Sequence, residues 1–146
     1  MRVEIELSAK ARQSLDGIVA AIEHHRGRPI KISEKDWLVG TGATGLWLPF
    51  PDVDDVLIMP TPSALYRTQI TLHELAHMIL GHDKIADAII TLTGPFIGEN
   101  AARQHALARS SGRNEYELAA EKLADELAAD IRPQSSEPGW FAEVMG

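Results

Sequence analysis

The stretch His73-Glu74-Leu75-Ala76-His77 constrains this chain more than any other part of its sequence. It has the pattern H-E-x-x-H. Because a helix turns about 100° per residue, residues four apart share a face, so His73 and His77 can present two imidazoles to one metal ion. Glu74 falls on the flank of that face, where a carboxylate can take a proton from a water on the ion. We therefore expect a helix that carries a metal site.

The residues around the motif predict a helix over about 62–80. Thr61 is a cap residue, Pro62 suits the first helical position and Gly81 supplies the stop. Apolar side chains recur on a stripe roughly opposite the two histidines, namely Leu65, Leu72, Leu75, Ala76 and Ile79. This stripe indicates that the helix packs on a core. A histidine pair held by hydrogen bonds, without a metal, is the alternative.

Composition bounds what can surround this helix. A length of 146 residues with 45% hydrophobic and 24% charged residues is typical of one globular domain. We assign residues 1–133 to that domain and 134–146 to a C-terminal tail, either mobile or docked. The chain has no cysteine, so a metal must be held by His and carboxylate, which suits a catalytic site better than a structural one.

Charge and hydropathy exclude several classes of partner. The net charge of −7 argues against nucleic acid, because the basic patches are as short as His24-His25-Arg26-Gly27-Arg28. We expect His24 and His25 to be solvated. The sequence has no apolar run near about 18 residues and no signal-peptide pattern after Met1, so we expect no membrane contact and a cytoplasmic location.

The order of the remaining elements predicts an α+β fold with a small twisted sheet packed against the metal helix. Residues 3–7 fit a short strand or an N-terminal arm, and Ser8 begins a helix that ends near residue 26. Strands are expected at 30–33, 45–50 and 56–59, and further helices at 83–93, 99–110 and 115–131. The strand at 56–59 either leaves an exposed edge for an extended peptide or lies buried in the core.

The helix at 115–131 matters because two histidines leave a catalytic zinc one protein ligand short. Its buried stripe is expected to contain Tyr116, Ala120, Leu123, Leu127 and Ile131, with Ala124 beside it. Glu117 and Glu121 lie at the margin of this stripe, where two like charges are costly unless cations or donors meet them. A zinc ion for Glu117 and an imidazole N–H for Glu121 would satisfy both. The alternative is a capping box of Asn114 and Glu117 with a solvated Glu121.

His82 competes with Glu117 for the third position. It lies nine residues after His73, one short of the metzincin spacing, and a continued helix would place it on the opposite face. We therefore expect His82 to support the site or to pack, unless Gly81 redirects it to the metal. Asp83 is a weaker candidate ligand. Three residues could polarise a substrate carbonyl, although the sequence does not place them: His105, Arg113 and Tyr116.

These residues also carry a family resemblance. The run from Arg67 to His82 resembles the ImmA/IrrE family of metallopeptidases, with its H-E-[LIF]-[GA]-H-x-[LI]-[LC]-G-H core. The run Glu117-Leu118-Ala119-Ala120-Glu121-Lys122-Leu123-Ala124 is similar to the family's E-x-x-A-[ND]-x-[FL]-A stretch, and the likeness covers roughly residues 15–130. The resemblance implies a zincin-like fold with Glu117 as third ligand and Glu121, where Asn or Asp is usual, supporting it.

The expected function is therefore a zinc-dependent endopeptidase with one Zn²⁺ per chain, held by His73, His77 and Glu117, with Glu74 as general base. The resemblance implies a protein substrate such as a helix-turn-helix transcriptional repressor, which would be a separate protein because this chain has no room for that module. Two alternatives stay open. One is a zinc-dependent module that sequesters a repressor without cutting it, and the other is a metal hydrolase of a small amide.

Overall fold

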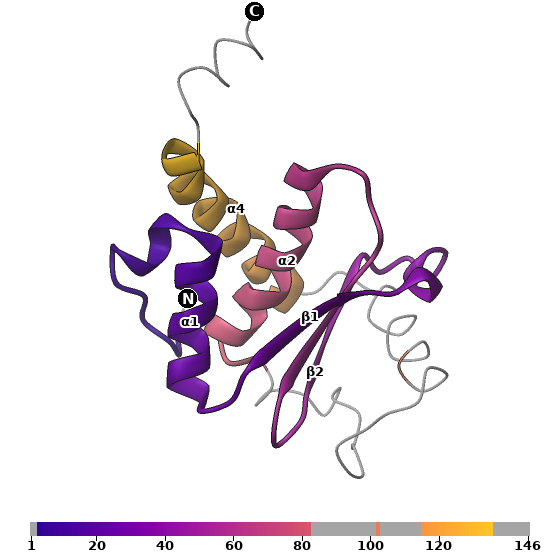
Figure 1. Ribbon diagram of the computed structural model, residues 1–146, viewed down its shortest axis with the longest axis horizontal. Helices are drawn as coiled ribbons and strands as arrows, with labels where there is room; N and C mark the ends of the chain where they lie inside the picture. The colour runs from indigo at the N-terminus through magenta and orange to yellow at the C-terminus, as the bar shows by residue number, and fades with distance from the viewer. Residues whose placement is uncertain (1–2, 83–101, 103–114, 136–146) are drawn as a thin grey trace, which may run out of the picture.

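The computed structural model of the chain describes residues 3–82, 102 and 115–135 (Figure 1). A three-stranded mixed sheet packs with three helices, which confirms the predicted α+β class. The helices predicted at 83–93 and 99–110 lie outside the described residues except for Ala102, which is helical and buried. Asp83, His105, Arg113 and the tail after Ser135 also lie outside them.

The sheet contains β1 (Ile30–Glu34), β2 (Gly45–Pro49) and β3 (Asp54–Ile58). Its strand order is β1-β3-β2, with β3 parallel to β1 and antiparallel to β2. The strand before the helix with the histidine motif is therefore central, which excludes the exposed edge, one of the two possibilities left open for it. The alternative, a buried core strand, is correct, because β3 is paired on both sides and Val56, Leu57 and Ile58 are buried.

Both faces of the sheet are covered by apolar side chains. Successive residues of a strand point to opposite faces, so Val56 and Ile58 share one face and Leu57 the other. The first face belongs to the larger core, which also contains side chains of the three helices, such as Ile18, Leu75 and Leu127. The second face packs in a smaller cluster with Leu38, Leu46, Leu48, Phe50 and Ala102. In Figure 1, α2 lies between the sheet and α4.

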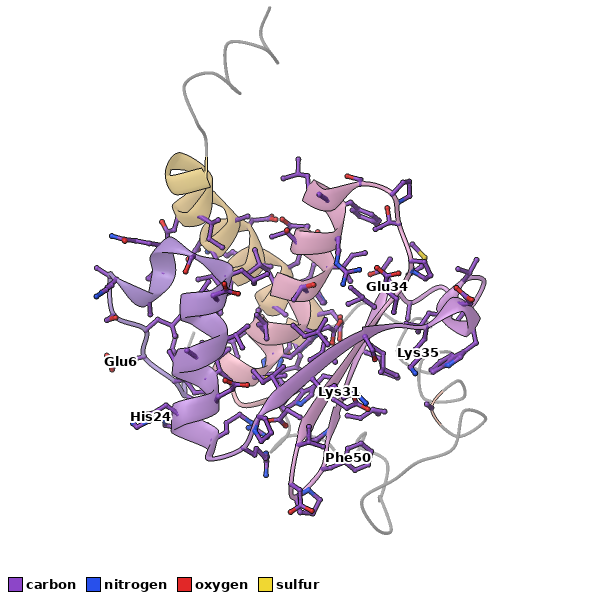
Figure 2. All side chains as sticks on the ribbon, viewed as in Figure 1. Glu6, His24, Lys31, Glu34, Lys35 and Phe50 are labelled. Carbon is purple, nitrogen blue, oxygen red and sulfur yellow. The ribbon has the colours of Figure 1, made fainter. Side chains whose placement is uncertain are left out.

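The first predicted helix is divided in two. A short 3₁₀ turn, η1 (Ala11–Gln13), follows Ser8, whose Oγ accepts a hydrogen bond from the Ala11 N–H at 3.1 Å. Ser14 is extended and caps α1 (Leu15–Arg26) by accepting from the Gly17 N–H at 2.9 Å. The helix ends at Gly27, as predicted. His24 and His25 are exposed, and Figure 2 shows His24 projecting outward from α1.

The helix that carries the histidine motif is α2 (Ala64–Ile79), and Ser63 caps it in place of the predicted Thr61. The Ser63 Oγ accepts from the Tyr66 N–H at 3.1 Å. Four residues of the predicted core stripe, Leu72, Leu75, Ala76 and Ile79, are buried. Leu65 is 64% exposed, so its assignment to the core was wrong. Leu65 lies in the first turn of α2, whereas the buried residues of this helix begin at Ile70.

The N-terminal segment is an arm and not a strand. The backbone N–H groups of Glu4 and Ile5 both donate to the carbonyl oxygen of Ile79, at 2.7 and 3.1 Å. The last carbonyls of a helix lack partners within the helix, so this contact satisfies one of them. Ile5 is buried in the larger core. The arm thus fixes the end of α2 that carries the histidine motif.

The long helix α4 (Glu115–Ser135) continues past Pro133, so the predicted end at residue 131 was too early. A proline removes one backbone donor, and so close to the end of a helix this loss does not stop the preceding turns from forming. Ala120, Leu123 and Leu127 are buried as predicted, whereas Tyr116 is 37% exposed and does not belong to the core stripe. None of the helices in the described ranges is both long enough and apolar enough to cross a membrane.

Candidate metal centre

The site forms where α2 and α4 run antiparallel. Gln69, in the first half of α2, donates through Nε2 to Asp125 Oδ1 of α4 at 2.9 Å. His73, one turn later on α2, contacts Glu117, which lies two turns earlier on α4. Contacts that advance along one helix and retreat along the other define antiparallel packing. The histidine half of α2 therefore meets the first turn of α4.

Two histidines of α2 and one carboxylate of α4 converge at this point. His73 Nε2 lies 3.1 Å from Glu117 Oε1, and His77 Nε2 lies 3.3 Å from Glu117 Oε2. The two imidazole rings are 4.9 Å apart between centroids and nearly perpendicular, at 81°. The three candidate ligand atoms all lie within 4.8 Å of one another. His73, His77 and Glu117 thus form a group that could hold a metal ion.

The chemistry of this group fits a catalytic zinc ion. Two imidazole nitrogens and one carboxylate oxygen are a common set of three protein ligands, which leaves a fourth position for water. The side chain of His77 is only 7% exposed, whereas those of His73 and Glu117 are 23% and 25% exposed. The group is therefore anchored on the core by His77 and reaches solvent on the side of His73 and Glu117.

Glu74 is buried next to the start of β2. The residue is only 1% exposed, although it directly follows His73, which is partly exposed. A Cβ atom built on Gly45 would lie 2.9 Å from Glu74 Oε2 and 3.0 Å from Ile70 Cγ2. The first residue of β2 thus passes directly over the carboxylate, and only a glycine leaves room for it. The role of Glu74 as general base stays a prediction.

His82 lies behind His77 and not among the three converging ligand atoms. Gly81 adopts a left-handed conformation with φ 70°, which turns the chain back toward α2. His82 Nδ1 consequently lies 2.8 Å from His77 Nδ1. The ring of Tyr116 also contacts the His82 ring edge-on, with centroids 5.3 Å apart. A continued helix would have sent His82 to the opposite face, so the glycine decides its position.

Glu121 lies one helical turn after Glu117 on α4 and is exposed. Its expected hydrogen bond with an imidazole N–H stays a prediction. Tyr116, which we considered as a group that polarises a substrate carbonyl, is positioned against His82 by its ring contact.

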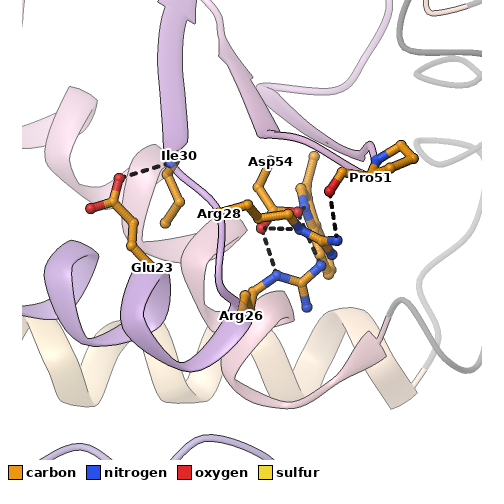
Figure 3. A network of polar contacts seen from close by, with 7 residues as sticks. Glu23, Arg26, Arg28, Ile30, Pro51 and Asp54 are labelled. Atoms are coloured by element: carbon orange, nitrogen blue, oxygen red, sulfur yellow. Dashed lines mark hydrogen bonds and ion pairs between the residues drawn. The ribbon is translucent and has the colours of Figure 1, made fainter.

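A buried ion-pair network was not predicted from the sequence (Figure 3). Asp54, which is fully buried, accepts from Arg26 Nε at 2.6 Å and Arg26 Nη2 at 3.0 Å. Arg28 Nε donates to the same carboxylate at 3.2 Å and Trp47 Nε1 at 3.0 Å. The Arg26 guanidinium also lies 5.0 Å from the centre of the Trp47 ring. The network joins the end of α1 to β2 and β3.

One signal in the sequence could have revealed this network. Asp54 alternates with Val56 and Ile58, so a strand with these two residues in the core must also direct Asp54 inward. A buried carboxylate needs cationic or donor partners, and Arg26 and Arg28 are the basic residues just before β1. These arginines, noted above as part of a short basic patch, are therefore engaged with a carboxylate inside the protein.

Comparison of the chain with protein-family models, with curated proteins and with solved structures found no match in any of the three.

Proposed function

We propose that this chain is a zinc-dependent endopeptidase that hydrolyses a peptide bond in a protein substrate. The observation that supports it most is the convergence of one ligand atom each from His73, His77 and Glu117 within 4.8 Å of one another. The H-E-x-x-H order adds a carboxylate, Glu74, directly after the first of these histidines. The resemblance to ImmA/IrrE metallopeptidases supports the same reading, and suggests a helix-turn-helix repressor as the substrate class.

In this proposal each residue has a separate task. His73, His77 and Glu117 would hold one zinc ion, which, when bound, makes water more acidic and polarises a carbonyl oxygen. Glu74 takes the proton of the attacking water and delivers it to the leaving amine. Substrate enters from the side where His73 and Glu117 are partly exposed, because His77 and Glu74 are covered by the core and by β2.

The burial of Glu74 favours the alternative function, a zinc-dependent module that binds a repressor without cutting it. A carboxylate with 1% exposure meets attacking water only if the site admits that water beneath the start of β2. A module that only binds a repressor through zinc needs no such access. The variant Glu74→Gln separates the two readings, because it keeps the size of the side chain and leaves the three ligands untouched.

The test begins with zinc content. The purified chain should bind about one zinc ion, and His73→Ala and His77→Ala should lose it, because each removes one of three protein ligands. The zinc-loaded chain, its Glu74→Gln variant and the chelated chain are then incubated with a proteome-derived peptide library, and new termini are identified by mass spectrometry. Cleavage should require zinc and fall by about 10²–10⁴-fold in Glu74→Gln. Stoichiometric zinc in both histidine variants, or equal cleavage by Glu74→Gln, contradicts the proposal.

A further inference from the structure

His82 contacts the candidate ligand His77 at Nδ1, the nitrogen of the His77 ring that faces away from the candidate metal position. An imidazole has two distinct nitrogens, and a metal ligand that uses Nε2 keeps Nδ1 for a hydrogen bond to its surroundings. In this protein His77 directs Nε2 toward Glu117 and Nδ1 toward His82, at 3.3 and 2.8 Å. Because His82 Nδ1 contacts His77, this atom cannot also bind a metal ion held by His73, His77 and Glu117.

We propose that His82 is a positioning residue for the metal site, which orients His77 through a hydrogen bond between their Nδ1 atoms. The inference depends on the zinc site proposed above. A metal on Nε2 leaves the proton of His77 on Nδ1, which must then donate, so His82 Nδ1 must accept. This fixes His82 as the tautomer with its proton on Nε2. The hydrogen bond thus sets the orientation of the His77 ring.

The surroundings of His82 hold its ring in place. Gly81 turns the chain so that His82 reaches His77, and the Tyr116 ring contacts the imidazole at an interplanar angle of 68°.

Two substitutions separate hydrogen bonding from packing. His82→Phe keeps a ring against His77 and Tyr116 but removes the nitrogen, whereas His82→Asn removes the ring but keeps an oxygen near the place of Nδ1. Zinc affinity is measured by competition with a chelator, and the thermal stability of the chelated forms shows that both variants fold. We expect His82→Phe to bind zinc about 10–100-fold more weakly than the wild type, and His82→Asn to recover most of that loss.

Other outcomes overturn the proposal without affecting the zinc site. Wild-type affinity in His82→Phe, or a larger loss in His82→Asn than in His82→Phe, would show that the ring only packs. A loss in His82→Phe as complete as in His73→Ala would make His82 a ligand. If instead the wild type binds no zinc, the proposed function fails.

Nitrogen NMR of the histidine rings measures the direction of the hydrogen bond independently, at a pH well above the ordinary range of imidazole titration. In the zinc-loaded protein His77 should carry its proton on Nδ1 and His82 on Nε2. A zinc-loaded protein in which His82 carries its proton on Nδ1 would overturn the proposed hydrogen bond.

Discussion

His73 Nε2 and Glu117 Oε1 lie 3.1 Å apart across 44 residues of sequence and join the two helices of the candidate metal centre. The same carboxylate reaches His77 through its other oxygen. One ion bound to all three residues would connect α2 to α4. Zinc binding and the stability of this helix pair should therefore be linked.

Glu117→Gln should remove most of the stabilisation that zinc gives to the folded protein. A ligand that binds only the native state stabilises it by about 2.7 kcal/mol when its free concentration is about 100 times Kd. The wild type should therefore melt at higher temperature with zinc than after chelation, and the variant should show little difference. Thermal melts of both forms give the result. Glu126→Gln, an equal charge change at an exposed position of α4, is the control.

The capping-box alternative for Glu117 makes a different prediction. Loss of a cap partner would cost on the order of 1 kcal/mol with or without zinc and would leave zinc affinity unchanged. Equal losses of stability in the zinc-loaded and chelated forms would therefore favour the cap over the metal ligand.

Gly45→Ala should disturb Glu74 while sparing the metal ligands. The new Cβ would lie 2.9 Å from Glu74 Oε2, closer than real Cβ contacts, so the carboxylate or β2 must shift. We expect a destabilisation of about 1–3 kcal/mol, typical of overpacking, and a loss of hydrolysis larger than the loss of zinc affinity. The double variant Gly45→Ala/Glu74→Ala should recover part of the stability, because residues in contact are energetically coupled. Strict additivity of the two single effects would contradict the contact.

Asp54→Ala should be one of the most destabilising substitutions in the described structure. The substitution removes a fully buried carboxylate that pairs with Arg26, whose side chain is 8% exposed, and breaking a buried pair costs about 3–5 kcal/mol. Asp130→Ala is the matched control. It breaks the pair with Arg12, whose two side chains are 33% and 44% exposed, and should change stability by less than about 1 kcal/mol. Denaturant unfolding of both variants makes the comparison, and similar costs would contradict the burial argument.

Asp55→Asn should stabilise the protein at neutral pH. Burial raises the pKa of Asp55 above its ordinary 3.8, while Lys31 and Lys35 act in the opposite direction. Figure 2 shows both lysines on the side of β1 away from α1. Asp55 Oδ1 is buried and has no hydrogen-bond partner within the described ranges. The charged form is therefore the unfavourable one in the folded protein.

The sign of the pH effect follows from proton binding. A raised pKa means that the folded state binds a proton more readily than the unfolded state, so this group lowers stability as pH rises from about 3.8 through the raised value. The wild type should lose stability across that window relative to Asp55→Asn, in melts recorded as a function of pH. Asp52→Asn, at an exposed position, should not alter the pH dependence in this way.

Much of the local structure could be predicted because it depends on neighbouring residues. The ends of α1 and α2 are set by Gly27 and Gly81, and the strands by short β-branched or apolar runs between turn residues. The place of Glu117 beside the two histidines was also predicted, because a carboxylate beside a core requires a positive partner, and its role as third ligand stays a prediction. Errors occurred where burial depends on distant parts, as at Leu65 and Tyr116.

The sequence by itself determined that His73 and His77 share one helical face, because the turn angle of a helix is fixed by its backbone. It also determined that any metal must be held by nitrogen and oxygen, because the chain has no cysteine. Only the tertiary structure decided that β3 is central and that His82 contacts His77. It also decided that Asp54 accepts hydrogen bonds from Arg26, Arg28 and Trp47. Strand order, ion pairing and the path after Gly81 all depend on contacts between segments far apart in the chain, and no local pattern encodes which of those contacts has the lowest free energy.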